Sequence, residues 1–441
     1  MSGSPTPTAD RATRTARWRI GRQSALTLAD QLVSSASNFL LGVLVARAGG
    51  TESLGTFGVA FLVWLAVLGF NRALVAEPLT VVGSTRHRDA RLPDGLAATL
   101  AVGVCSSSVL LVLGGVLVAV LGDGPAVGPL LVLAACIPSL LAQDYCRSMA
   151  FRLHRPTVAL YSDLLFAGVQ VALSVALLAG GEDSSELFIA AWGVGATAGA
   201  VLGVVMLRAW PVTRGGLRLL REMWPRSKWF VAEFCTAFPA DQGYLLLLPL
   251  LLGADRFGLY RAGTGLIGPV VVILIAGGNI GLPGSVRRLR TDGLPGLARY
   301  ARLLTLAVAG VTIVYCGLIT LFAGTALHLV YGSDFVDATT VTRMIAAQYV
   351  LLALSFGYGQ AVKAAGQVRS LWISRMVSAV LSIVAVVLLS TQLGLVGAGA
   401  ASMLSGLAYS VGVAVAYRGL RSASKSRHRR GRDTALAPDR R

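Results

Sequence analysis

The chain has 441 residues, of which 55% are hydrophobic and 14% are charged, and its mean hydropathy is +0.69. A soluble globular domain carries about 25% charged residues, so this composition excludes a chain whose surface is mostly exposed to water. The formal net charge of +18 would also suit a nucleic-acid-binding protein. The positions of the charges decide between these two classes.

Apolar runs long enough to cross a membrane recur along the whole chain. A transmembrane helix needs about 20 predominantly apolar residues, and twelve segments reach this length. In chain order they are residues 24–48, 55–81, 95–121, 127–150, 157–180, 186–207, 229–252, 257–283, 300–323, 338–362, 370–391 and 394–417. The first run leads directly into the second, so we expect a retained helix and not a cleaved signal peptide. The sequence predicts an all-α integral membrane protein with about 12 transmembrane helices.

Basic residues alternate from one side of these segments to the other. All but five of the 39 Lys and Arg residues lie in every second connection or in the two terminal tails. Cytoplasmic connections carry an excess of Lys and Arg, which predicts a protein of the cell (cytoplasmic) membrane with both termini cytoplasmic. The positive charge then reflects topology and attraction to anionic lipids at the cytoplasmic face, and nucleic acid is not expected as a partner.

The two halves of the chain resemble each other when the sequence is shifted by 203 residues. Asp30 then aligns with Glu233, and the turn 50–57 aligns with 253–260, where Gly, an acid, Gly and an aromatic residue recur. We therefore expect two six-helix lobes related by a pseudo-two-fold axis along the membrane normal, as in several transporter folds. The predicted parts are a basic N-terminal tail 1–22, an N-lobe 23–207, a basic linker 208–228, a C-lobe 229–417 and a basic disordered tail 418–441.

Acidic side chains lie inside several predicted spans. A charge at mid-membrane costs about 2.5 kcal/mol or more unless it faces protein or water, so these residues are candidates for ion coupling or gating. They are Asp30, Glu233, Asp241, Asp144 and Asp163. Asp144 could instead pair with Arg147, three residues away on the same helix face. The recurrence of an acid at Asp30 and Glu233 favours a cation or proton site or a gating contact.

Arginine side chains inside the spans are candidates for binding a diphosphate, because the guanidinium fork matches phosphate oxygens. They are Arg72, Arg261, Arg343 and Arg47. Arg343 has no carboxylate within four residues along the chain. Arg47 and Arg261 could instead extend to the outer membrane surface, and Arg72 could pair with Glu77.

Motifs of metal, redox or nucleotide chemistry are not found in the sequence. The five cysteines form no CxxC pair, the four histidines form no HExxH motif, and no GxxxxGK[ST] loop occurs. We therefore expect no metal, no cofactor and no use of ATP. The longest outer connection, 324–337, is too short for the catalytic pocket of a polymerase or glycosyltransferase, so a membrane enzyme is a less favoured alternative and no catalytic residue is assigned.

Several passages resemble a known transporter group. These are ADQL at 29–32, NFLLG at 38–42, LGTFG at 54–58, QDYCR at 143–147 and GLYRA at 258–262. They are similar to polysaccharide or O-antigen-type flippases of the multidrug/oligosaccharidyl-lipid/polysaccharide (MOP) exporter superfamily, and in particular to actinobacterial-like members. The resemblance extends over essentially the whole chain. The lipid II flippase branch differs in having fourteen helices, and its cavity arginines do not map one by one onto this chain.

This resemblance implies a V-shaped pair of lobes, a cationic cavity for a pyrophosphate, and transport driven by an ion gradient or the membrane potential. The expected function is a flippase that moves a lipid-diphosphate-linked oligosaccharide from the inner to the outer leaflet, with polysaccharide-assembly proteins as further partners. The alternative is an ion-coupled multidrug antiporter of the same superfamily. Its cation would use the acids at Asp30, Asp163, Glu233 and Asp241, whereas Arg72, Arg261 and Arg343 would repel cationic drugs.

Overall fold

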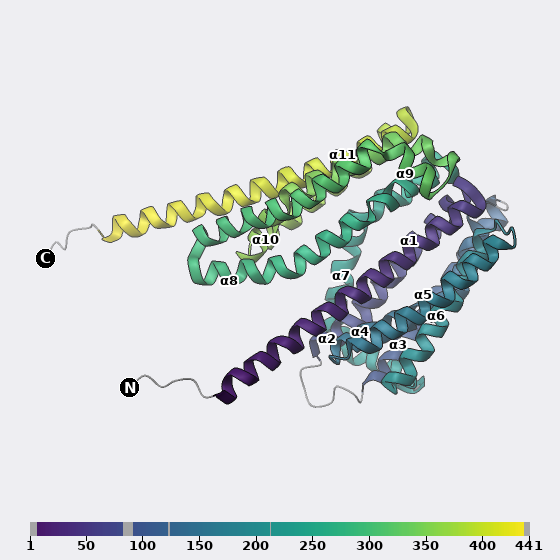
Figure 1. The fold of residues 1–441 in the computed structure, drawn as a ribbon, viewed down its shortest axis with the longest axis horizontal. Coiled ribbons are helices and arrows are strands. Elements are labelled where there is room, and N and C mark those ends of the chain that lie inside the picture. Colours follow the sequence, from purple (N-terminus) through teal and green to yellow (C-terminus); the bar gives the residue numbers. More distant parts are fainter. Residues whose placement is uncertain (1–6, 83–90, 122–123, 212, 436–441) are drawn as a thin grey trace. The chain divides into compact units, whose positions relative to one another are not determined.

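The computed structural model describes residues 7–82, 91–121, 124–211 and 213–435, and within these ranges the chain is helical with no β-strand (Figure 1). Nine of the described helices are long and apolar enough to cross a membrane. The predicted all-α, multi-pass membrane fold is therefore confirmed. Arg86 and Arg88, which contributed to the predicted orientation, lie outside the described residues.

Three of the nine helices each contain two predicted spans, and a break at one glycine separates the two spans. At all three glycines φ lies between +59° and +69°, a backbone conformation that glycine adopts at little cost. The helices and their glycines are α1 (Pro7–Asn71) with Gly50, α8 (Ala254–Leu321) with Gly293, and α11 (Val368–Ala435) with Gly394. Dividing these three helices at the glycine gives twelve described transmembrane segments, in agreement with the twelve predicted from the sequence.

The chain divides into two compact units, Met1–Phe238 and Pro239–Arg441, which we call unit 1 and unit 2. Unit 1 contains α1, the π-helical turn η1 (Arg72–Ala76), α2 (Glu77–Val82), α3 (Leu92–Leu121), α4 (Val127–Arg152), α5 (Pro156–Ala179), α6 (Ser185–Leu207) and the first part of α7 (Thr213–Leu252). In this unit α4 packs against α3 and α6, and α5 packs against α1 and α6. These contacts bring α1, α4 and α5 together around the site described below.

Small residues permit the close approach of helices within unit 1. Gly193 and Gly203 of α6 face Cys136 and Cys146 of α4, and a Cβ atom added at either glycine would collide with the facing cysteine side chain. Association of membrane helices depends on such close packing, because lipid tails are as apolar as the helix surfaces. The α4–α6 contact thus fixes the position of the polar side chains that α4 carries.

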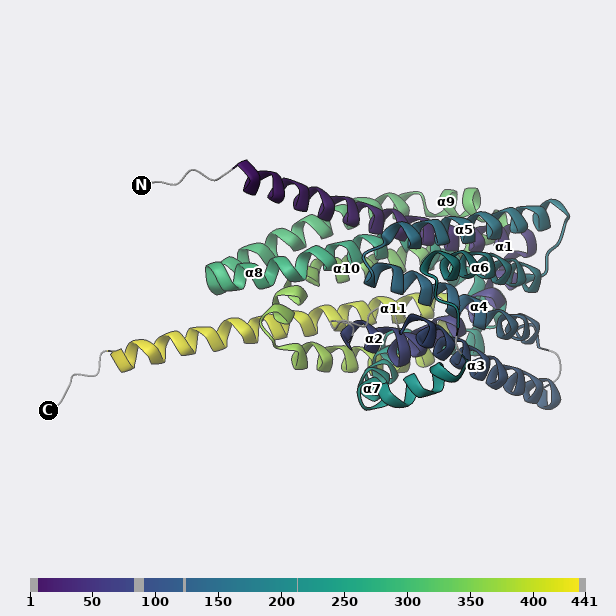
Figure 2. The same ribbon diagram turned by 90° about the horizontal axis from the view of Figure 1, so that it is seen from below.

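Unit 2 contains the last part of α7, α8, the short α9 (Ala323–Val330), the 3₁₀ turn η2 (Ser333–Ala338), α10 (Thr339–Ala364) and α11. Here α10 packs between α8 and α11, so it forms the centre of the unit (Figure 2). Gly253, which the duplication aligns with Gly50, also has a positive φ, of 83°. The two predicted equivalent turns therefore share the glycine conformation that the repeat requires.

Two segments differ from the linker and the tail that the sequence predicts. The predicted linker 208–228 is helical from Thr213 onward, and α7 continues from there through the seventh span, so the boundary between the units falls inside α7 at Phe238. The predicted disordered tail 418–441 is helical as far as Ala435. Between residues 418 and 435 the Ala, Lys and Arg residues are good helix formers and no proline occurs, which allows α11 to continue.

Candidate functional site

A buried ionic cluster joins three helices of unit 1. Arg147 of α4 donates to Asp30 Oδ2 of α1 from Nη2 at 2.7 Å and from Nε at 2.9 Å. The same Nε lies 3.2 Å from Asp163 Oδ2 of α5. The side chains are 16% exposed for Arg147, 0% for Asp30 and 3% for Asp163. We call Asp30, Arg147 and Asp163 the acidic cluster.

The acidic cluster contains one positive charge for two carboxylates. Gln143 Nε2 donates to Asp163 Oδ1 at 2.6 Å, which holds that carboxylate in place. Asp30 Oδ1 is buried and accepts no hydrogen bond from any described residue. Burying an uncompensated charge is costly, so the cluster favours uptake of a proton or of a small cation.

A second ion pair lies beside the π-helical turn of unit 1. Arg72, the first residue of η1, binds Asp144 of α4 through Nε at 3.0 Å and through Nη2 at 2.5 Å. The predicted pairing of Asp144 with Arg147 is therefore wrong. Although the two residues lie three apart on α4, each meets an opposite charge from a different part of the chain, and these partners offer a bidentate or buried geometry that a same-helix pair does not.

Two further acids of unit 1 are exposed. Glu77 at the start of α2 and Glu233 of α7 both have exposed side chains, and they are close enough to repel each other electrostatically. Glu77 also interacts electrostatically with Arg72. Glu233 thus has an environment unlike that of Asp30, the residue with which the repeat aligns it.

The candidate residues of unit 2 do not form a single cluster. Asp241 of α7 lies 3.0 Å from Arg375 of α11, measured from Oδ1 to Nε. Arg261 of α8 interacts electrostatically with Tyr331, Tyr260 and Tyr349. Arg343 of α10 donates from Nε to the carbonyl oxygen of Thr320 at 3.1 Å.

Arg343 and Arg47 both lie near an end of a helical segment: Arg343 is four residues after the start of α10, and Arg47 is three residues before the break at Gly50. Thr320 belongs to the last turn of α8, where carbonyl groups have no partner within the helix, so Arg343 stabilises that helix end. Arg47 is exposed. Within unit 1, Arg47 lies seventeen residues along α1 from Asp30 and is not part of the acidic cluster.

Sequence reasoning missed three features of these sites. Arg375 was counted only as an orientation signal and Arg147 was considered only as a partner of Asp144, yet Arg375 pairs with Asp241 and Arg147 with Asp30 and Asp163. Asn71 is fully buried at the end of α1, and neither polar atom of its amide has a hydrogen-bond partner among the described residues. Asn71 could have been selected from the sequence, because an amide inside an apolar run is expected to need a hydrogen-bond partner.

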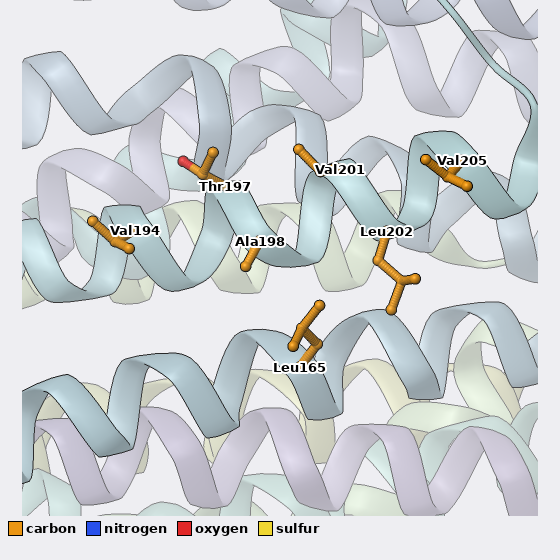
Figure 3. A pocket seen from close by; sticks show the side chains of 7 residues that line it. All are labelled: Leu165, Val194, Thr197, Ala198, Val201, Leu202 and Val205. Atoms are coloured by element: carbon orange, nitrogen blue, oxygen red, sulfur yellow. The ribbon is translucent and has the colours of Figure 1, made fainter.

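The described part of unit 1 also has an apolar cavity of about 590 Å³ between α5 and α6 (Figure 3). Its lining residues are Leu165, Val194, Thr197, Ala198, Val201, Leu202 and Val205. The hydroxyl of Thr197 donates to the carbonyl of Gly193 at 2.8 Å and so is already engaged. This cavity suits hydrocarbon, and it contains none of the charged candidate residues.

No protein-family model matches the sequence, and no curated protein matches it. Solved structures do match. The lipid II flippase MurJ in an inward closed conformation has a TM-score of 0.68 at 11% identity, over 89% of this chain and 87% of that chain. An inward-facing multidrug resistance MATE family transporter of the MOP superfamily has a TM-score of 0.66 at 14% identity, over 91% and 99%.

A third match is a MOP superfamily transporter from Pyrococcus furiosus, described as having a binding pocket of reverse polarity. Its TM-score is 0.63 at 14% identity, over 92% of this chain and 95% of that chain. These likenesses show that the chain has the fold of MOP superfamily transporters. Because a flippase and multidrug transporters share this fold, the substrate has to be argued from the residues of the chain.

Proposed function

We propose that this protein is a cation-coupled flippase for a lipid-diphosphate-linked oligosaccharide, a precursor of a polysaccharide or another cell-envelope glycan. It moves the lipid from the inner to the outer leaflet of the cytoplasmic membrane by alternating access, and its termini are cytoplasmic. The solved structures that share the fold are transporters, which supports a transport function and not an enzymatic one.

The opposite charge balance of the two units carries this proposal. The comparison counts charged residues more than one helical turn inside the predicted spans. In unit 1 these are five carboxylates, Asp30, Glu77, Asp144, Asp163 and Glu233, and one arginine, Arg72; the acidic cluster adds Arg147, which lies closer to the end of its span, so five acids face two bases. In unit 2 they are three arginines, Arg261, Arg343 and Arg375, and one carboxylate, Asp241. Acids suit a coupling cation, and an excess of arginine suits an anionic substrate.

In this mechanism the acidic cluster of unit 1 binds the coupling ion. A proton or sodium ion on Asp30 or Asp163 balances the second carboxylate and changes how tightly Arg147 holds α1 to α4 and α5. Ion binding can shift the equilibrium between the inward-open and outward-open states only if the two states bind the ion with different affinities. The proposed contacts of the diphosphate and sugar are Arg261 and Arg343 within unit 2, and Arg72 and Arg47 within unit 1, each unit taken by itself.

An ion-coupled multidrug antiporter is the second candidate, and one observation favours it. Arg72 and Arg147 are both engaged by carboxylates in unit 1, while Glu77 and Glu233 remain exposed. Exposed acids of this kind suit an organic cation better than a diphosphate. The two candidates therefore make opposite predictions for the charge of the transported molecule.

The test is transport by the purified full chain in liposomes, with a proton or sodium gradient applied in separate samples. A fluorescent polyprenyl-diphosphate oligosaccharide reports flipping, and a fluorescent organic cation reports antiport. We expect flipping of the lipid that accelerates with one of the two gradients. Asp163→Asn is expected to retain flipping but to lose the acceleration, because an asparagine still accepts the hydrogen bond from Gln143 but carries no charge.

Asp292→Asn is the matched control, since Asp292 pairs with Arg288 on an exposed turn at 2.9 Å and lies outside the acidic cluster. It should behave as the wild type. Transport of the organic cation without any movement of the lipid would replace the flippase with the antiporter. Equal acceleration in the wild type and in Asp163→Asn would remove Asp163 from the coupling site.

A further inference from the structure

Unit 2 holds an ion pair deep inside its transmembrane segments. Arg375 and Asp241 are paired at 3.0 Å, and their side chains are 46% and 43% exposed. Asp241 precedes the end of α7 at Leu252 by eleven residues, and Arg375 follows the start of α11 at Val368 by seven. At 1.5 Å per residue these positions are about 16 Å and about 10 Å from the helix ends.

Because the Asp241–Arg375 pair is partly exposed, it needs polar surroundings within the membrane. Charged side chains at this depth are costly in hydrocarbon and occur where they face protein or a water-filled cavity. Nearly half of each of these two side chains is exposed. Within a membrane, the exposed part of this pair therefore requires water or a polar ligand beside it.

Two further polar side chains lie near Arg375. Lys363, in the last turn of α10, and Tyr409 of α11 both interact electrostatically with Arg375. Tyr409 packs against a buried apolar cluster that includes Val362 and Val413, which fixes its position. Helices α7, α10 and α11 thus bring together two cations, one carboxylate and one phenol.

The guanidinium of Arg375 is only partly used by Asp241. Its Nε lies 3.0 Å from Asp241 Oδ1, and 46% of the Arg375 side chain is exposed. Asp241 therefore orients the guanidinium, and the exposed part of the side chain is accessible to a further acceptor. A phosphate group accepts two parallel hydrogen bonds from one edge of a guanidinium, and a lysine ammonium adds a point charge.

The predicted duplication aligns the spans that carry Asp241 and Arg375 with the spans of unit 1 that carry the acidic cluster. The transmembrane part of α7 is the first span of unit 2, and the first half of α11 is its fifth. In unit 1 the first and fifth spans carry Asp30 and Asp163 of the acidic cluster. The same pair of spans thus carries an ionic group in each unit, with an excess of acid in unit 1 and an excess of base in unit 2.

We propose that Arg375, Lys363 and Tyr409, with Asp241 orienting Arg375, form a binding site for a phosphate ester or diphosphate. This site rests on the proposed function: it adds Arg375, Lys363 and Tyr409 to the residues proposed there as contacts of the transported lipid's diphosphate. A free inorganic phosphate or pyrophosphate offers the same chemistry. The two sources are distinguished by the probes used in the test.

The experiment measures binding to the purified full chain in nanodiscs of neutral phosphatidylcholine. One set of titrations uses inorganic pyrophosphate, and the other uses a polyprenyl diphosphate. Arg375→Gln is expected to weaken the binding of both probes about tenfold or more, because it removes a charge-assisted, two-point contact. Lys363→Gln should weaken binding by a smaller factor, since a lysine contributes a single point charge.

The matched control is Arg288→Gln, which removes an arginine from another Arg–Asp pair on an exposed turn of unit 2 and should leave both affinities unchanged. Asp241→Asn gives a second, independent readout. It retains an acceptor for Arg375 Nε but removes the negative charge, so pyrophosphate should bind about threefold or more tightly. A purely structural ion pair would not produce tighter binding.

Unchanged pyrophosphate affinity in Arg375→Gln, or weaker binding in Asp241→Asn, would overturn the site. If the wild type and Arg375→Gln flip the lipid-linked oligosaccharide at the same rate, the site is wrong and the flippase function stands. If pyrophosphate binds in an Arg375-dependent manner but no polyprenyl diphosphate binds and no lipid is flipped, the site stands with a free phosphate as its ligand. In that case the proposed flippase function fails.

Discussion

Arg147 and Asp30 are separated by 117 positions in the sequence, and the guanidinium of Arg147 donates twice to one carboxylate oxygen of Asp30. Asp30 is fully buried and Arg147 nearly so. This pair ties α1 to α4, and through Asp163 it also ties both helices to α5. The contact that links the three helices is thus also the one that a coupling ion would alter.

Removing Arg147 should strongly destabilise unit 1. Arg147→Met leaves two buried carboxylates without their cation, and breaking a buried ion pair in this way costs about 3–5 kcal/mol. We expect a clearly lower melting temperature in detergent. The compensated variant Arg147→Met/Asp30→Asn/Asp163→Asn should recover most of the loss, since it leaves no buried charge. An Arg147→Met protein that melts like the wild type would contradict the assigned pairing.

Arg72 and Asp144 should show a measurable energetic coupling in a double-mutant cycle. The pair is bidentate, with Asp144 7% and Arg72 40% exposed, so a coupling of about 1 kcal/mol is expected from Arg72→Gln, Asp144→Asn and the double variant. The measurement is chemical or thermal unfolding in detergent. The exposed pair Arg288–Asp292 serves as a reference and should show no measurable coupling. Equal coupling energies for the Arg72–Asp144 and Arg288–Asp292 pairs would contradict the burial of Asp144.

Gly357 of α10 should not tolerate a methyl group. A Cβ atom there would collide with the carbonyl oxygen of Ala301 and with Thr305 of α8, so Gly357→Ala must separate two packed helices. Overpacking of this kind costs about 1–3 kcal/mol, which we expect as a lower melting temperature. Gly310→Ala on α8 is the control, because no atom lies within 4 Å of its added Cβ. If both variants melt alike, the α8–α10 contact is looser than described.

The predicted orientation can be tested by labelling single cysteines in a variant whose five native cysteines are replaced. Glu182 and Thr291 are both exposed, and the positive-inside pattern assigns them to opposite sides of the membrane. A membrane-impermeant maleimide added to intact cells should react with Glu182→Cys. Thr291→Cys should react only after the membrane is permeabilised. The reverse result would invert the orientation and move both termini outside.

The sequence by itself determined the number of spans, their approximate ends and their predicted orientation. A span is recognised from the local length of its apolar run, and orientation is indicated by the local count of Lys and Arg. Neither property depends on which helices are neighbours. For example, the predicted span 338–362 corresponds closely to α10, Thr339–Ala364.

The tertiary structure decided which charges meet. Asp144 and Arg147 lie close together on α4, but α1, η1 and α5 supply the partners that bind them. Pattern reasoning could not find these partners, because lipid and the protein core are both apolar and the sequence of a span says little about which of its faces is buried. The pairing of Asp241 with Arg375 likewise exists only because α7 and α11 fold together within unit 2.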